Sequence, residues 1–133
     1  MTSIVRAAGA ISEEVLGLWD PTTAGVTVTT AGTAVDTEEL VGDIMLVGAV
    51  SHITGGDSAV LSIQHSDTNV DGNFAEFSPA LASDTADATH GGGVADVLDR
   101  ASVKRYVRAK ITIVGATVVV TAFAACLGLP KTS

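Results

Sequence analysis

The stretch from Val103 to Leu127 constrains the fold more than any other part of this 133-residue chain. It reads VKRYVRAKITIVGATVVVTAFAACL, two apolar runs on either side of Gly115. In the first run, hydrophobic side chains such as Val107 alternate with polar ones such as Arg108, which is typical of a half-buried β-strand. The second run is apolar on both faces, as a central strand is. We therefore predict a long hairpin that turns at Gly115 and closes the core of an all-β domain.

The same region also raises the alternative of a transmembrane helix. Residues 111–129 are nineteen positions without a charge, which is near the minimum length for a membrane-spanning helix. Gly115, three threonines and a run of three valines disfavour a helix, and the alternation continues unbroken from the preceding residues. The pattern therefore favours a strand, and we expect no membrane partner.

Composition excludes several function classes. The net charge of −8 argues against nucleic acid as a partner, because phosphates would repel the chain. A single cysteine, Cys126, rules out an internal disulfide framework and a CxxC motif. The N-terminal residues make a poor signal peptide. Many Val, Thr and Gly residues and few aromatic ones favour β structure over helices.

The chain divides into an N-terminal arm (1–25), a β-sandwich domain (26–129) and a C-terminal tail (130–133). Within the arm, Ser12 to Leu16 could begin a helical turn with its acidic residues at the positive end. Trp19 has two possible roles, as an anchor on its own domain or on a neighbouring subunit, and the first is slightly favoured.

Turn residues divide the domain into seven or eight short strands. Before the main hairpin we expect strands at 26–30, 44–54, 58–66, 74–77 and 94–99. The second and third of these read as a hairpin through Gly55-Gly56-Asp57. Residues 81–93 read as a long mobile loop. This spacing predicts one domain, a β-sandwich or jelly roll, with no internal repeat.

The sequence Asp67-Thr68-Asn69-Val70-Asp71-Gly72 matches the first half of a calcium-binding loop. Alternate oxygen ligands, here Asp67, Asn69 and Asp71, could wrap the ion. The twelfth position is Ser78 rather than glutamate, and the flanking segments read as strands. An ordinary Asx-rich turn is the main interpretation, and a calcium site is the alternative.

Cationic residues concentrate just before and along the main hairpin. Five of the seven lie within eleven positions: Arg100, Lys104, Arg105, Arg108 and Lys110. Tyr106 shares a face with three of them. This ladder could pair with acidic residues of the same chain, or it could meet an acidic surface of a partner. Together with Trp19, these residues are the candidate partner contacts.

No catalytic constellation is visible. His52, His65 and His90 are too far apart in sequence for a local metal motif. Cys126 lies on an apolar strand, where a small buried hydrophobe is the ordinary role. The three glycines at 91–93 do not precede a helix, so they do not form a nucleotide-binding loop. We expect no enzyme activity and no cofactor apart from the calcium alternative.

Two segments carry a resemblance to a known class of proteins. One is the basic strand KRYVRAK (104–110) with its hydrophobic return strand and the small-residue ending AACLG (124–128); the other is VLSIQHSD (60–67) with its acidic loop and Phe74. Together they resemble small structural proteins of tailed bacteriophages, in particular head decoration (cement) proteins with a β-sandwich or jelly-roll core. The resemblance covers residues 44–127.

The resemblance implies a non-enzymatic protein located on the capsid surface of a virion. Its implied partners are the major capsid protein and further copies of the chain, with a trimer plausible. The arm up to Trp19, the loop 81–93 and the basic ladder would be the contact surfaces. Three alternatives stay open: a calcium-assisted carbohydrate- or receptor-binding β-sandwich, another head or tail component, and an enzyme on the same scaffold.

Overall fold

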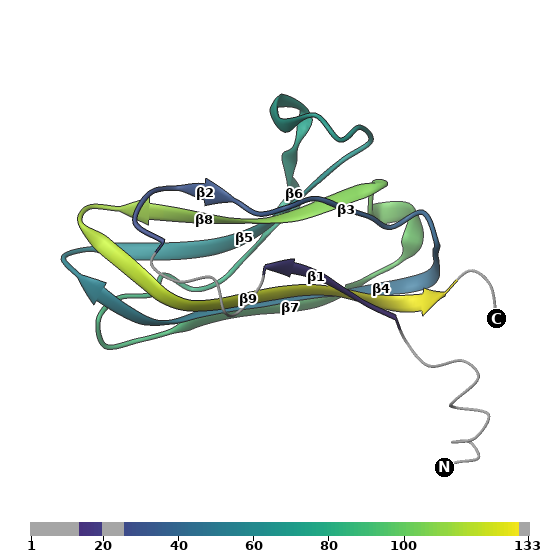
Figure 1. Ribbon diagram of the computed structural model, residues 1–133. Coiled ribbons are helices and arrows are strands. Elements are labelled where there is room, and N and C mark those ends of the chain that lie inside the picture. Colours follow the sequence, from purple (N-terminus) through teal and green to yellow (C-terminus); the bar gives the residue numbers. More distant parts are fainter. Residues whose placement is uncertain (1–13, 20–25, 131–133) are drawn as a thin grey trace, which may run out of the picture.

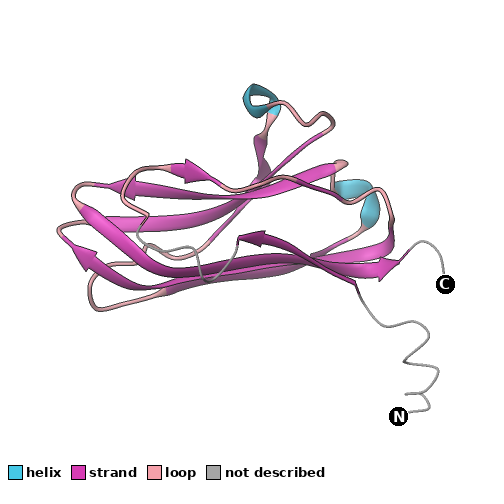
Figure 2. Ribbon diagram, in the orientation of Figure 1, coloured by secondary structure: helices cyan, strands magenta, loops and turns pink. Residues whose placement is uncertain are grey.

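The computed structural model describes residues 14–19 and 26–130, and in this part of the chain it contains strands and two short 3₁₀ helices but no α-helix (Figures 1 and 2). The strands are β1 (Glu14–Trp19), β2 (Thr30–Ala31), β3 (Val35–Asp36), β4 (Leu40–Gly55), β5 (Ser58–Ser66), β6 (Ala75–Ala82), β7 (Gly92–Leu98), β8 (Tyr106–Val114) and β9 (Thr117–Pro130). The 3₁₀ helices are η1 (Asp71–Asn73) and η2 (Arg100–Ser102). No helix in the described residues is long and apolar enough to cross a membrane.

The strands form two antiparallel sheets that lie one above the other (Figure 1). We call the four-stranded sheet β1-β9-β4-β7 sheet A. The other sheet, sheet B, has the order β2-β8-β5-β6, and β3 also belongs to it because β3 pairs with β8. β2 and β3 act as one interrupted strand, because both pair with β8. The chain passes back and forth between the sheets, and this strand order is that of an eight-stranded jelly roll. The predicted all-β sandwich with a jelly-roll-like core is therefore confirmed.

The core lies between the sheets and is made by alternate residues of each strand. Its largest fully buried side chains are Leu18, Ile44, Leu46, Val50, Leu61, Ile63, Val107, Ile111, Val119 and Cys126. Each such side chain contributes about 1.5–3 kcal/mol by leaving water. Hence period-two alternation in the sequence corresponds directly to an inward and an outward face.

The predicted hairpin between residues 103 and 127 is wrong in its pairing, although both strands are present. β8 pairs with β5 in sheet B, whereas β9 pairs with β4 and β1 in sheet A. Gly115, at φ 82°, therefore turns an arch from one sheet to the other. The predicted hairpin through Gly55-Gly56-Asp57 is wrong for the same reason, because β4 and β5 also lie in different sheets. Alternation identifies a strand but not its partner.

The N-terminal segment differs from expectation where it is described. Residues 14–19 form the edge strand β1, paired with β9, and not the end of a helical turn. Trp19 is 8% exposed and belongs to the core, so the interpretation that it anchors on its own domain is confirmed. The rest of the predicted arm, at 1–13 and 20–25, and the last tail residues, at 131–133, lie outside the described residues.

Two other predicted segments change in extent. The predicted strand at 26–30 is reduced to an isolated bridge between Val26 and Val119, followed by β2. The predicted loop 81–93 includes the end of β6 and the start of β7. Between them, Ala86 is fully buried and bridges to Ala59 of β5. Backbone bonding to β5 therefore ties the middle of this segment to the sandwich.

Candidate contact surfaces

The basic ladder lies on and before β8, at the outer face of sheet B. Arg105 is held by acidic residues of the same chain: it donates from Nε and Nη2 to Asp36, at 3.1 and 2.9 Å, and lies 2.7 Å from Glu38. The hydrogen bond from Arg105 holds the pKa of Asp36 below its usual range. These groups are all substantially exposed, so solvent screens each pair and its contribution to stability is small.

The other early members of the ladder also find partners within the chain. Arg100 donates to the backbone carbonyls of Val103, at 2.7 Å, and Thr37, at 3.3 Å. Lys104 lies 4.0 Å from Asp67. The internal-pairing interpretation is thus confirmed for Lys104 and Arg105, and contact with a partner stays a prediction.

Arg108 is the most enclosed cation of the ladder and forms a clamp on the β5–β6 loop. Its Nε donates to Gln64 at 2.9 Å, its Nη1 donates to Asp71 at 2.6 Å, and its guanidinium lies 4.2 Å from the ring centre of Phe74. Gln64 in turn donates to Glu76 at 2.9 Å. Since the loop projects from sheet B (Figure 2), this single side chain joins strand, loop and returning strand.

The geometry gives the calcium alternative no support. Two of the three candidate ligands are ion-paired: Asp67 faces Lys104, and Asp71 faces Arg108. These side chains supply the positive charge that a metal ion would supply in a calcium site. Asn69 lies on the exposed part of the same loop. Within residues 14–19 and 26–130 no group of three His, Cys, Asp or Glu side chains is placed to hold a metal ion. Hydrogen bonds from Arg108 to Asp71 and from Asn73 to Thr68 hold the loop, and the calcium site stays an alternative.

Replacing Arg108 by lysine should therefore loosen this loop. An ammonium group cannot donate to Gln64 and Asp71 in the fork geometry of a guanidinium, and Gln64 is buried. We expect a loss of about 1–3 kcal/mol in unfolding free energy and faster proteolysis between residues 67 and 73. Urea unfolding and limited proteolysis would measure both. Lys110→Gln, where the described residues show no ion pair, is the matched control and should change neither.

His65 and His90 do not converge. His65 stacks on Phe77 with ring centres 3.7 Å apart, and its Nδ1 accepts a hydrogen bond from the backbone N–H of Lys104 at 3.2 Å. His90 lies exposed in the loop before β7. The side chain of His52 lies outside the described part. A packed or solvated strand residue, the ordinary interpretation of such a histidine, fits His65.

His65 should give the fold a measurable pH dependence. Burial first, and then the charge of Lys104, lower its pKa below 6.5, so the unfolded state binds this proton more readily than the folded state does. The stabilising contribution is fully present above pH 6.5 and is lost as the pH falls below that value. The urea concentration at the unfolding midpoint should therefore be lower at pH 5.5 than at pH 8. This difference should be smaller for the His65→Gln variant. An equal difference in both proteins would contradict this assignment.

Cys126 is fully buried among core residues, on the inward face of β9. Burial raises the pKa of its thiol to about 11, which keeps it protonated and unreactive at neutral pH. The expected role of a small buried hydrophobe is therefore confirmed.

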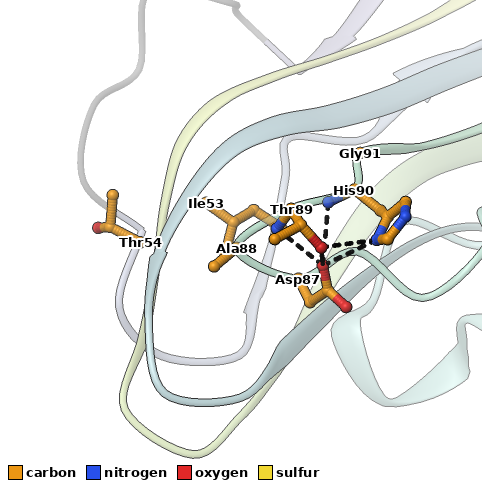
Figure 3. A pocket seen from close by; sticks show the side chains of 7 residues that line it. All are labelled: Ile53, Thr54, Asp87, Ala88, Thr89, His90 and Gly91. Carbon is orange, nitrogen blue, oxygen red and sulfur yellow. Dashed lines mark hydrogen bonds and ion pairs between the residues drawn. The ribbon is translucent and has the colours of Figure 1, made fainter.

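An open hollow of about 470 Å³ lies beside the 87–91 loop (Figure 3). Asp87 Oδ1 at its centre accepts from the backbone N–H groups of Thr89 and His90, each at 2.9 Å. These bonds, Thr89 first, lower the pKa of Asp87 to about 2. Thr89 Oγ1 lies 3.0 Å from Asp87 Oδ1 and 2.8 Å from His90 Nδ1, and that ring nitrogen lies 3.3 Å from Asp87 Oδ1. The carboxylate thus shapes the loop by bonding to both of these residues.

The outer face of sheet A is a surface that sequence reasoning missed. Its outward residues are almost all apolar or glycine, and they come from all four strands: Val15 and Gly17 of β1; Thr121, Phe123, Ala125, Leu127 and Leu129 of β9; Val41, Asp43, Met45, Val47, Ala49 and Ser51 of β4; Gly93, Ala95 and Val97 of β7. We call this set the apolar face. The signal was present in the sequence, because β4 and β9 are apolar on both sides, but that pattern was interpreted as burial within the domain.

Searches of protein-family models and of curated proteins find no match to this chain.

Proposed function

We propose that this chain is a non-enzymatic structural protein of a tailed-bacteriophage virion, and that it decorates and stabilises the assembled capsid as a homo-oligomer. One observation carries the proposal: an apolar face covers one side of a jelly roll, whereas three of the basic side chains on and before β8 pair with acidic residues of their own chain. A surface of this kind suits a protein that acts by contact with other copies and other proteins. The jelly roll adds support, since it is a common architecture of viral capsid proteins, although a fold alone does not assign function.

The mechanism follows from mass action. A protein that binds the assembled capsid, and binds separated subunits less well, shifts the equilibrium toward the assembled state. Many copies bound on one lattice, each held by a modest contact, would gain avidity from their linkage. A β domain with an exposed apolar face meets these requirements without any reaction chemistry.

A binding experiment tests this proposal. The purified protein is mixed with heads of its source particle from which it has been removed, and then sedimented with and without a calcium chelator. We expect it to sediment with assembled heads in both conditions, to stay in solution with unassembled capsid protein, and to raise the temperature at which heads disrupt. Failure to sediment with heads would contradict the proposal. Binding that is lost in the chelator would replace it with a calcium-dependent module.

A further inference from the structure

The two sheets of this jelly roll differ sharply on their outer faces. The outer face of sheet B carries polar residues such as Gln64, Arg108 and Lys110. The apolar face of sheet A, by contrast, has one charged residue, Asp43, and this lies near one end. Its exposed side chains include Val97, which is 55% exposed, and Phe123, which is 43% exposed. An antiparallel sheet usually presents a polar face to water. An apolar outer face such as that of sheet A is therefore typical of a contact surface.

The apolar face is large enough to supply a substantial part of a contact between two proteins. Four strands about 4.8 Å apart, and the nine residues from Thr121 to Leu129 at about 3.4 Å each, give roughly 400–500 Å² in projection. The relief of the side chains makes the accessible area larger. Standard interfaces bury about 800 Å² per partner, and the largest apolar patch of a typical monomer is about 300–600 Å². The face is therefore comparable with the largest apolar patch of a typical monomer, and such patches are often functional.

Charge favours a second copy of the chain as the occupant. With a net charge of −8, two copies repel each other over most of their surfaces. The apolar face is where this repulsion is weakest, because the described acidic side chains, Asp43 apart, point elsewhere. The cationic ladder lies toward the opposite sheet, and three of its members, Lys104, Arg105 and Arg108, are already paired with acids of their own chain.

The shape of the apolar face is complementary to itself. Strand register places Ala125, Val47 and Ala95 at one level across β9, β4 and β7. Small side chains at that level let two sheets approach. Consider a two-fold axis that lies between two stacked copies and runs across the strands at this level. On each strand, the residue two positions before this level would then face the residue two positions after it on the same strand of the second copy.

This symmetry matches large side chains with small ones. On β7, the protruding Val97 falls opposite Gly93, and on β4, Met45 falls opposite Ala49. On β9, Phe123 falls opposite Leu127, which lines a hollow of about 410 Å³ on the same face. Large side chains thus meet small ones on β7 and β4 with a single placement of the axis, and on β9 Phe123 meets the residue that lines the hollow.

We propose that the apolar face is a homodimer contact, in which two copies stack sheet A on sheet A about a two-fold axis at the level of Ala125. Packed sheets lie about 10 Å apart, so side chains from both copies would fill the layer between them as in a second sandwich core. The biological purpose of such a dimer rests on the proposed function. The dimer makes that function more specific, because it names the contact between copies. Its test uses purified protein alone, so failure to dimerise and failure to bind capsid are separate results.

Opposite charges at Ala125 test the position of the axis. In Ala125→Glu or Ala125→Lys alone, two like charges would face each other in the contact, and we expect the dimer dissociation constant to rise about 100-fold or more. An equal mixture of the two variants should restore the dimer, because glutamate then faces lysine. Sedimentation velocity on the single proteins and on the mixture measures this. Thr112→Glu and Thr112→Lys, exposed on sheet B, are the matched controls and should dimerise like the parent.

A second pair tests the register away from the axis. Val97→Lys and Gly93→Glu should each weaken the dimer and should associate with each other when mixed. A Cβ at Gly93 comes no closer than 3.5 Å to its neighbours, so the fold should accept this change, and thermal unfolding of each variant checks it. A monomeric or trimeric parent, undiminished dimers of the Ala125 variants, or mixtures that stay monomeric would each overturn the proposal.

Discussion

Gly55→Ala is expected to destabilise the domain by about 3 kcal/mol or more. Gly55 ends β4 at φ 109°, a conformation that side chains with a Cβ rarely adopt. A Cβ at this position would also overlap the carbonyl oxygen of Ala116 in the neighbouring arch. Backbone cannot move aside as a flexible side chain can, so strain and steric overlap add. Urea unfolding followed by tryptophan fluorescence, through Trp19, would measure the loss.

The next residue supplies the control for this prediction. A Cβ at Gly56 meets nothing within 4 Å, so Gly56→Ala should change the unfolding free energy by less than about 0.5 kcal/mol. Equal losses at both positions would show that the two arches are not packed together as described. The hydrogen bond from the Asp57 N–H to Thr117 Oγ1, at 2.9 Å, is a further direct link between the arches.

Leu61→Ala should lower the unfolding free energy by about 2–5 kcal/mol. Leu61 is fully buried at the centre of β5. Its Cδ2 occupies the space that Gly48 of β4 leaves open on the facing sheet, 2.5 Å from where a Cβ would lie. Truncation would open a cavity between the sheets, with little freedom for the neighbouring strands to collapse into it. The melting temperature should fall by about 10 °C or more.

Val60→Ala is the matched control on the other face of the same strand. Val60 is only half-buried and points away from the core, so its truncation should cost less than about 1 kcal/mol. If both truncations had the same effect, the inward and outward faces of β5 would have been assigned incorrectly.

Much of the fold could be predicted from local patterns alone. The strand predicted at 58–66 and the one predicted after Val103 are both present, the latter from Tyr106. The chain also turns at Gly55 and Gly115 as predicted, although each turn is an arch between sheets and not a hairpin. The strand partners could not be predicted this way, because an arch between sheets and a hairpin within one sheet use the same local signals. Only the packing of both sheets decides between them. Residues 14–19 were misjudged for a related reason: the pairing with β9, which is distant in sequence, overrides their weak helical signal.

The candidate surfaces divide in the same way. The acidic partners of the basic ladder are far away in sequence, for example Asp36 for Arg105, so only the sheet pairing reveals them. The apolar face was visible as double-sided apolar strands. However, a strand that is buried on both sides has the same composition as a strand with one apolar face exposed. The structure distinguishes the two, because it shows which side is covered by other residues of the same chain.

The measurement that tests the central proposal most directly is a quantitative mass-spectrometric count of this chain in purified particles of its source. The account predicts that the chain is present in many copies and in a fixed ratio to the major capsid protein, and that it is lost together with its stabilising effect when particles are stripped. Absence from the particles would contradict the proposed function. Presence in only a few copies would contradict decoration and assign the chain to another head or tail component.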